Sequence, residues 1–344
     1  MQINIGISEG KTASISTDEA VNCHISITGV SGSGKSVAGQ MIVKNIAEQG
    51  GTVVVFDMHR LFAQENILPA LQEEIIAFSN DIAVFDDGLR LPLFTPLQFI
   101  DGSTEDEEDA VVAVATTLAR PLRLGCQQRA DLLRALSFVS REGLYEVQGI
   151  RALEDGLELV SSEVAQNVKD KLRYILKRNV FRHGEPFIEE GAINILRLSS
   201  FDLNTQALIA ELVLSHLWRE AQTGVFLRKP LWLFLDEVQN LPFGTGKGIV
   251  DQILAEGRKF GLNLILITPR ADKKALAALS QAGTQLYFAP AAEEAKAVAR
   301  ALKPGMEKDL LWQLRSLKRG ECFVSGALEV NGNQIRRPLR VRIG

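Results

Sequence analysis

The sequence contains few of the residues that build disulfide frameworks and metal sites. Its three cysteines, Cys23, Cys126 and Cys322, are odd in number, lie far apart and never form a Cys-x-x-Cys pair. A disulfide framework or a zinc knuckle is therefore not expected, and buried thiols in a reducing cytoplasm are the simplest interpretation. The four histidines also lack a metal-binding spacing, and no Ser/His/Asp or Cys/His catalytic set can be defined.

Long hydrophobic runs and an excess of one charge are missing as well. No stretch approaches the roughly 18 apolar residues of a membrane span, and residues 1–5 do not resemble a signal peptide, so no membrane insertion is expected. Lys and Arg number 38 against 42 Asp and Glu, which gives a net charge of −4. This balance argues against a protein that coats nucleic acid over its whole surface, but it permits a local basic channel.

What the 344 residues do contain is a regular order of apolar segments that predicts an α/β fold. A strand at 23–28 runs into a glycine-rich turn, a helix at 37–49 and a buried strand at 52–57. This order implies a right-handed crossover and a mainly parallel sheet. Further strands are expected at 82–85, 192–198, 231–235, 262–267, 285–288 and 321–324, with helices at 205–221 and 247–259.

Residues 101–185 show helical spacing and almost no proline. They open on an acidic cluster, in which we expect Thr104 to cap a helix with Glu107 as its capping-box partner, although an acidic functional patch stays open. The predicted organisation is a β-hairpin at 1–21, a first part of the α/β core at 22–100, a helical insertion at 101–185 and a second part of the core at 186–344.

The strongest motif is Gly29-Val30-Ser31-Gly32-Ser33-Gly34-Lys35-Ser36, which fits GxxxxGK[ST] between a strand and a helix. Such glycines let backbone N–H groups surround phosphates, Lys35 is expected to bridge the β- and γ-phosphates, and Ser36 to ligate Mg²⁺. A glycine turn before a helix is the alternative. The residues expected to bind the nucleotide are Gly29, Ser31, Gly32, Ser33, Gly34, Lys35, Ser36 and Val37.

A second motif is the apolar strand 231–235, which ends in two adjacent acids, Asp236 and Glu237. In P-loop ATPases the first acid holds Mg²⁺ and the second polarises the attacking water. A solvated strand end is the alternative, but the presence of the P-loop in the same chain favours the functional interpretation. The glutamate favours an ATPase over a Ras-type GTPase, which orients its water with glutamine.

These motifs and several weaker ones resemble the HerA/FtsK superfamily of hexameric P-loop DNA translocases, on the HerA and conjugation-ATPase side. The weaker ones are Phe56-Asp57-Met58-His59, like D-x-H; Asp236-Glu237-Val238-Gln239-Asn240-Leu241, like D-E-A-H-x-L; Glu256-Gly257-Arg258-Lys259-Phe260-Gly261-Leu262, like E-x-R-K-x-G; and Leu317-Lys318-Arg319-Gly320-Glu321-Cys322-Phe323-Val324, like L-x-x-G-E-x-x-V. The resemblance implies a RecA-like P-loop core with the helical insertion, which binds ATP and Mg²⁺. It places His59 near the nucleotide, although Asp57-Met58-His59 could equally be a structural strand end.

The resemblance also implies a homohexamer that translocates on or remodels double-stranded DNA. It further implies either work with a partner nuclease or other effector, in end resection or phage defence, or a role in conjugation or packaging. The sequence does not choose among these roles. The length leaves no room for a separate nuclease domain, so any cutting is expected to come from a partner.

Two departures from the family pattern stand out. The family usually has Ser/Thr-Gln-Arg-Pro after the strand at 262–267, where the Gln senses the γ-phosphate, whereas this sequence has Thr268-Pro269-Arg270. Pro269 has no polar side chain for this task, and Thr268 is the candidate substitute, so slower or partner-dependent hydrolysis is open. Only about 20 residues precede the first P-loop strand, too few for the small β-barrel of full-length HerA proteins.

Basic residues provide the remaining candidates. By resemblance Arg258 is the first candidate to reach a neighbouring subunit's γ-phosphate and Arg270 the second, although Arg258 also suits a helix C-terminus. Phosphate contacts in a pore are expected from Lys247 in the loop 242–248 and from Lys273 and Lys274, unless these loops are only solvated surface. The basic stretch at 169–182 is expected to be a helix face or subunit contact, and that at 315–344 chiefly a protected edge strand.

Two other classes of function stay open. The first is a nucleotide-gated ring that assembles a partner effector with little ATP turnover, which Pro269 motivates. The second is a monomeric P-loop kinase or transferase. An ABC-type ATPase is not expected, because no LSGGQ-like signature occurs.

Overall fold

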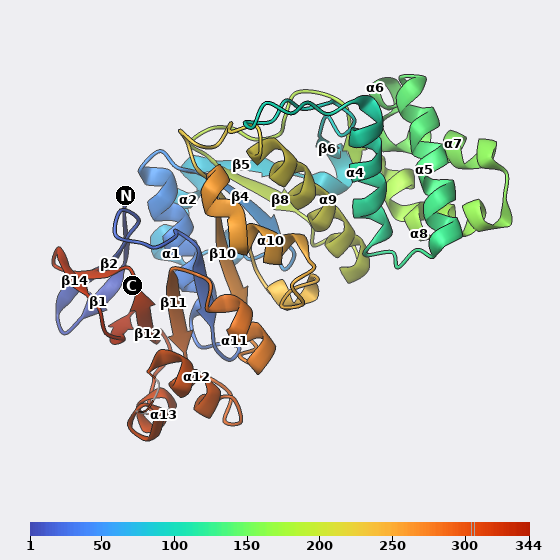
Figure 1. The fold of residues 1–344 in the computed structure, drawn as a ribbon. Helices are drawn as coiled ribbons and strands as arrows, with labels where there is room; N and C mark the ends of the chain where they lie inside the picture. The colour runs from blue at the N-terminus through green and yellow to red at the C-terminus, as the bar shows by residue number, and fades with distance from the viewer. Residues whose placement is uncertain (304, 306) are drawn as a thin grey trace. The chain divides into compact units, whose positions relative to one another are not determined.

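The computed structural model describes residues 1–303, 305 and 307–344, which divide into two compact units (Figure 1). Unit 1 comprises Met1–Asn80, Glu189–Ile195 and Phe226–Gly344, and unit 2 comprises Asp81–Ile188 and Leu196–Val225. In the described part of the chain, no helix is long and apolar enough to span a membrane.

Unit 1 is built on one large sheet. Its strands are β1 (Gln2–Ser8), β2 (Lys11–Ser16), β3 (Ile25–Thr28), β4 (Thr52–Asp57), β9 (Leu231–Leu235), β10 (Leu262–Thr268), β11 (Thr284–Phe288), β12 (Glu321–Gly326), β13 (Leu328–Val330), β14 (Asn333–Ile335) and β15 (Leu339–Arg342). With β5 (Ser79–Ile82) and β8 (Ile193–Arg197), the order is β14-β13-β2-β1-β15-β12-β11-β3-β10-β9-β4-β8-β5.

The centre of this sheet is parallel and the other half is antiparallel. Strands β11, β3, β10, β9 and β4 pair in parallel, and β4, β9 and β10 are buried along their whole length, as expected for strands covered on both faces. This confirms the predicted α/β class with a mainly parallel central sheet. The helices of unit 1 are α1 (Lys35–Glu48), α2 (Gln72–Phe78), α10 (Ile249–Glu256), α11 (Lys273–Leu279), α12 (Ala295–Leu302) and α13 (Glu307–Arg315), with short 3-10 turns η1 (Gln64–Asn66), η2 (Pro69–Leu71), η4 (Val238–Asn240) and η5 (Gly257–Phe260).

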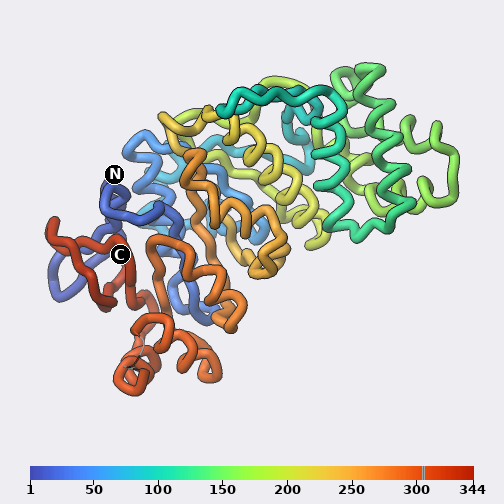
Figure 2. The backbone as a smooth tube through the Cα atoms, viewed as in Figure 1, coloured from blue at the N-terminus to red at the C-terminus, as the bar shows by residue number. Residues whose placement is uncertain are grey.

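The amino-terminal hairpin of β1 and β2 belongs to the antiparallel half. It turns through Glu9 and Gly10, both with positive φ. Strand β1 also pairs with β15, and β2 pairs with β13, so the first and last segments of the chain lie side by side (Figure 2). Pairing on both sides protects backbone groups that an isolated hairpin would leave exposed.

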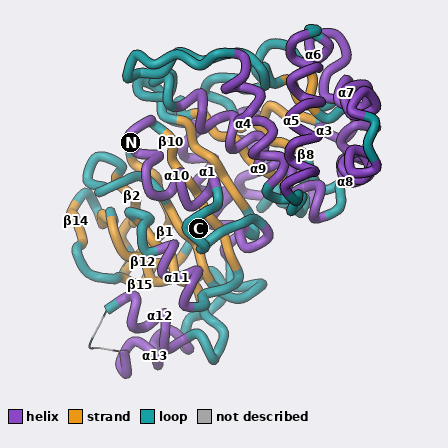
Figure 3. Tube along the Cα trace, turned by 45° about the vertical axis from the view of Figure 1, so that its right-hand side comes forward, coloured by secondary structure: helices purple, strands orange, loops and turns teal. Residues whose placement is uncertain are grey.

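Unit 2 is mainly helical (Figure 3). Its elements are α3 (Val84–Asp87), β6 (Leu89–Arg90), α4 (Glu107–Ala119), α5 (Cys126–Arg141), α6 (Leu144–Gln148), η3 (Gly149–Ala152), α7 (Leu153–Val160), α8 (Glu163–Arg178), β7 (Phe181–Arg182) and α9 (Leu203–Ala221). The segment 101–185, expected to be a helical insertion, lies within this unit and contains α4–α8, together with the two-residue strand β7.

Three local predictions in this region were wrong. Cys126, expected to be a buried thiol, is exposed at the start of α5. The strand expected at 82–85 ends at Ile82, and Val84 begins α3. Thr104 does not cap α4: the helix begins at Glu107, and Asp106 is its N-cap, in a reciprocal capping box with Asp109. Every residue of 105–109 is acidic, so the sequence alone offers several capping registers of similar quality.

Candidate nucleotide site and adjacent groove

The carboxyl ends of the parallel strands bring the predicted site residues to one edge of unit 1. Strand β10 lies between β3, which leads into the P-loop, and β9, which leads into the acidic pair. Thr268 is level with Thr28, and Leu266 with Leu235, so residues 29 and 236 follow within one residue of the level of Thr268. We call this the carboxyl edge, and the opposite ends of the same strands the amino edge. Ligands of parallel α/β sheets bind at carboxyl edges.

The glycine-rich loop is held in place by close backbone contacts. Gly29 and Gly34 have φ values of 146° and 116°, and a Cβ atom would lie 2.6 Å from Phe288 Cβ at Gly29 and 3.0 Å from Gly320 Cα at Gly34. Val30 N–H donates to the Ala289 carbonyl (2.9 Å), and Gly320 N–H donates to the Ser33 carbonyl (2.8 Å). Only glycine fits these two positions, because a side chain would clash with neighbouring segments of the same chain. The loop can therefore lead directly into the start of α1, where backbone N–H groups bind phosphates in P-loop proteins.

Lys35 begins α1, with its side chain folded over the loop. Its Nζ donates to the Val30 carbonyl at 2.9 Å, and the residue is only 8% exposed. Burial lowers the pKa of Lys35, while the negative charges of Asp236 and Glu237 oppose the shift. Ser33 Oγ also donates to Val30 (2.7 Å), whereas Ser36 is exposed and Val37 half-buried. The free hydroxyl of Ser36 suits a metal ligand better than that of Ser33.

The acidic pair follows β9. Burial, with the neighbouring Glu237 carboxylate, raises the pKa of Asp236 to about 6, against the effects of His59 and Lys35. Glu237 has a left-handed φ of 52°, and its Oε2 lies 3.3 Å from Nε2 of His59. A bound cation would relieve this crowding of charge. No cluster of three or more His, Cys, Asp or Glu among the described residues could hold a metal, so Mg²⁺ would need Ser36 and Asp236 together with phosphate oxygens.

The structure gives Thr268 a partner that was not expected from the sequence. Thr268 is 1% exposed, and its Oγ1 donates to Oε1 of Gln239 at 2.9 Å while accepting from the Arg270 N–H at 3.2 Å. Gln239 lies in η4, three residues after Asp236. The only sequence signal for it was its position within the acidic motif.

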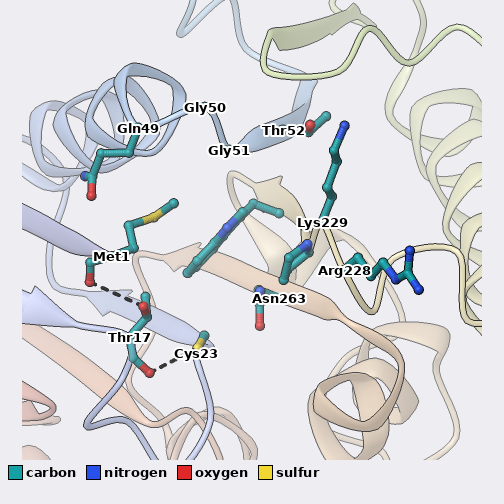
Figure 4. Close-up of a pocket in the computed structure, with 12 residues that line it drawn as sticks. Met1, Thr17, Cys23, Gln49, Gly50, Gly51, Thr52, Arg228, Lys229 and Asn263 are labelled. Atoms are coloured by element: carbon teal, nitrogen blue, oxygen red, sulfur yellow. Dashed lines mark hydrogen bonds between the residues drawn. The ribbon is translucent and has the colours of Figure 1, made fainter.

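The two candidate arginines lie at opposite edges. Arg270 is exposed and follows β10 at the carboxyl edge. Arg258 is exposed in η5, before β10 begins. Its positive charge opposes the effect of burial, which raises the pKa of Cys23. Cys23 lines a pocket of about 300 Å³ at the amino edge with Trp232 and Asn263 (Figure 4). Arg258 is therefore remote from its own chain's P-loop.

All three candidate lysines line one groove of about 660 Å³. Lys247 lies in the loop 242–248, and Lys273 and Lys274 open α11; all are exposed. The buried Asp251 shapes this loop, because its carboxylate accepts from the backbone N–H groups of residues 244, 245 and 246 at 2.8, 3.0 and 2.7 Å. Sequence reasoning missed Asp251, which looks like an ordinary helix residue.

Some residues of the other basic stretches are engaged within the chain. Lys169 pairs with Glu158 at 2.7 Å, Lys171 donates to the Leu122 carbonyl at 3.0 Å, and Arg178 lies over the Phe85 ring. On β15, Arg340 pairs with Glu321. These contacts favour the structural interpretations over phosphate binding.

Comparison with known proteins identifies the family. A family model described as "Helicase HerA, central domain" matches residues 3–217. The chain belongs to the HerA family. This confirms the resemblance drawn from the motifs.

HerA relatives match nearly the whole chain. The DNA double-strand break repair helicase HerA of Pyrococcus furiosus is 23% identical over 96% of this chain and 66% of its own length. The probable DNA double-strand break repair helicase HerA of Methanocaldococcus jannaschii is 22% identical over 91% of this chain and 71% of its own. The chain thus spans about two thirds of the length of these relatives.

Solved structures share the fold. VirB4 of Thermoanaerobacter pseudethanolicus superimposes with a TM-score of 0.70 at 16% identity, covering 99% of this chain and 96% of its own. The plasmid coupling protein TrwB, in complex with ADP and Mg²⁺, gives 0.60 at 12% identity, covering 93% and 84%. These similarities confirm the RecA-like P-loop fold of this HerA-family chain.

Proposed function

We propose that this HerA-family chain is an ATPase that works as a hexameric motor and translocates on, or remodels, double-stranded DNA. The observation that carries the proposal is the meeting of the P-loop and the acidic pair at one edge, beside a groove with three exposed lysines. The relatives from P. furiosus and M. jannaschii, named as repair helicases, support the DNA substrate.

The roles of the residues follow from their places. Lys35 gives up its hydrogen bond to the Val30 carbonyl and contacts the β- and γ-phosphates instead. The free N–H groups at the start of α1 donate hydrogen bonds to phosphate oxygens. Ser36 and Asp236 hold Mg²⁺, which neutralises phosphate charge when bound. Glu237 orients and deprotonates water, and His59, at 3.3 Å, holds its carboxylate in place.

The position of Arg258 is the basis for a ring. An exposed cation at the amino edge cannot reach its own P-loop, but it can enter a neighbour's site and stabilise charge on the transferred phosphoryl group. Six copies would each turn Lys247, Lys273 and Lys274 toward one pore, which suits a chain with net charge −4. A partner nuclease or other effector, in DNA repair or phage defence in the cytoplasm, belongs to the same proposal.

The test is ATP hydrolysis with and without duplex DNA, together with particle mass in the presence of Mg²⁺ and an ATP analogue. We expect DNA-stimulated turnover from a hexamer, reduced roughly 10²- to 10⁴-fold by Glu237→Gln, which keeps the shape of the side chain and removes the base. A particle with the mass of one chain would contradict the ring and favour a monomeric kinase or transferase.

A nucleotide-gated ring that assembles an effector is the second candidate. Pro269 favours it, because it leaves residue 269 without a side-chain hydrogen bond to phosphate. Assembly with negligible turnover in every condition would support this scaffold over the motor.

A further inference from the structure

We propose that Gln239 supplies the phosphate-sensing amide that residue 269 lacks, and that its bond to Thr268 passes the nucleotide state to the lysine-lined groove. This inference rests on the proposed ATPase function and adds a residue and a coupling route to it.

The place of Gln239 fits a sensing role. Strand β10 lies between the P-loop strand β3 and the acidic strand β9, so a group held against the end of β10 lies at the same edge of the sheet as the P-loop and the acidic pair. Thr268 holds Gln239 at this position through a 2.9 Å hydrogen bond. Pro269 follows Thr268 directly and contributes no donor.

The chemistry of the amide also fits. Thr268 Oγ1 donates to Gln239 Oε1, which fixes the amide oxygen as an acceptor. The amide nitrogen donates to no acceptor among the described residues. A half-buried amide with its oxygen engaged and its N–H₂ group free is a donor held ready for a phosphate oxygen.

The same bond joins the two segments that form the groove. From Gln239 the chain runs through the loop 242–248, which carries Lys247; from Thr268 it runs into α11, which carries Lys273 and Lys274. The walls are also close at Gly244, where a Cβ atom would lie 3.5 Å from the Lys274 carbonyl. A change at the Gln239–Thr268 bond is therefore transmitted to both walls within a few residues.

Three variants separate the donor from the link. Gln239→Leu removes both, and Gln239→Glu keeps an oxygen that accepts from Thr268 but removes the N–H₂ donor. Thr268→Val keeps the donor and removes the link, together with the acceptor of the Arg270 N–H. Gln313→Leu, at an exposed position on α13, is the matched control. Melting temperatures identify any variant that fails to fold. If Gln239→Leu fails to fold, Gln239→Glu still tests the donor.

Three quantities are measured: turnover with saturating duplex DNA, affinity for a fluorescent ATP analogue, and the ratio of DNA affinities with a non-hydrolysable ATP analogue and with ADP. We expect Gln239→Leu and Gln239→Glu to lower turnover about 10²-fold, while the nucleotide affinity of the uncharged variant Gln239→Leu stays within about three-fold of the wild type. Thr268→Val and Gln239→Leu should bring the ratio of DNA affinities close to one. A purely structural role would not move this ratio selectively.

Wild-type turnover and an unchanged ratio in the Gln239 variants would overturn the inference and leave the ATPase proposal intact. Full turnover in Gln239→Glu alone would overturn the donor role. A wild-type protein without DNA-stimulated hydrolysis would contradict the proposed function itself, and the inference with it.

Discussion

The two edges of the parallel sheet in unit 1 differ sharply in how their polar groups are satisfied. At the amino edge, Nδ1 of the buried His24 accepts from Leu264 N–H at 3.0 Å, and the Asn22 side chain accepts from the N–H groups of His24 and Gly283 and donates to the Gln281 carbonyl. At the carboxyl edge, Lys35 has a lowered pKa, Asp236 a raised pKa, and Glu237 a left-handed backbone.

This difference shows which edge of the sheet contains locally unfavourable backbone conformations and charge interactions. Left-handed backbone and crowded charges persist only where the surrounding structure enforces them, and they gather at functional sites. The amino edge has a closed hydrogen-bond network and two exposed arginines: Arg258, and Arg228, which lines the pocket shown in Figure 4. The carboxyl edge is therefore prepared for a ligand, whereas the polar groups of the amino edge are satisfied within the chain; contact of Arg258 with a neighbour belongs to the proposal.

The largest predicted effect tests whether the two edges meet between subunits. We expect Arg258→Ala to lower turnover about 10³-fold, because it removes a cation from a neighbour's transition state. Mixing it with Glu237→Gln should restore activity, since some interfaces then combine an intact Glu237 with an intact Arg258. Arg270→Ala serves as the comparison at the carboxyl edge. Loss of turnover on Arg270→Ala, with Arg258→Ala active, would reverse the assignment.

The second prediction concerns the closed network of the amino edge. Burial holds the pKa of His24 down at about 4, against 6.5 for a free imidazole. The folded state thus keeps His24 neutral while the unfolded chain takes up a proton, so its contribution is complete above pH 6.5 and is lost as the pH falls toward 4. A difference of 6.5 − 4 = 2.5 pH units corresponds to about 3 kcal/mol.

Unfolding of the nucleotide-free protein, followed by denaturant at pH 7.5 and near pH 4, measures this loss. His24→Asn keeps an acceptor for Leu264 N–H without a titrating group and should lose about 3 kcal/mol less than the wild type. His183→Asn, at an exposed position, is the control and should behave as the wild type. Equal losses in His24→Asn and the wild type would show that the imidazole is not held neutral.

The smallest predicted effect concerns the groove beside the carboxyl edge. Asp251→Ala removes the acceptor of three backbone N–H groups and should weaken duplex DNA binding roughly ten-fold, or about 1.4 kcal/mol, with ATP affinity unchanged. Lys247→Ala should reduce the salt dependence of DNA binding by about one unit of log–log slope. Unchanged DNA affinity and slope in both variants would remove the groove from the proposed DNA path.

Prediction from sequence succeeded where a residue type is required by local geometry. The P-loop glycines and the apolar strand before Asp236 are such cases, because left-handed turns and buried strands each demand particular side chains. Prediction failed where several local solutions are similar in energy, as for the cap of α4, which uses Asp106 in place of Thr104.

The sequence by itself determined the α/β class, the residues of the P-loop and the acidic pair, and the absence of a polar side chain at Pro269. Only the tertiary structure decided that Gln239 meets Thr268 and that Asp251 shapes the loop carrying Lys247. The reason is physical. Local conformation follows from neighbouring residues, whereas contacts between strand ends depend on the order of strands in the sheet, and that order is set by packing across the whole chain.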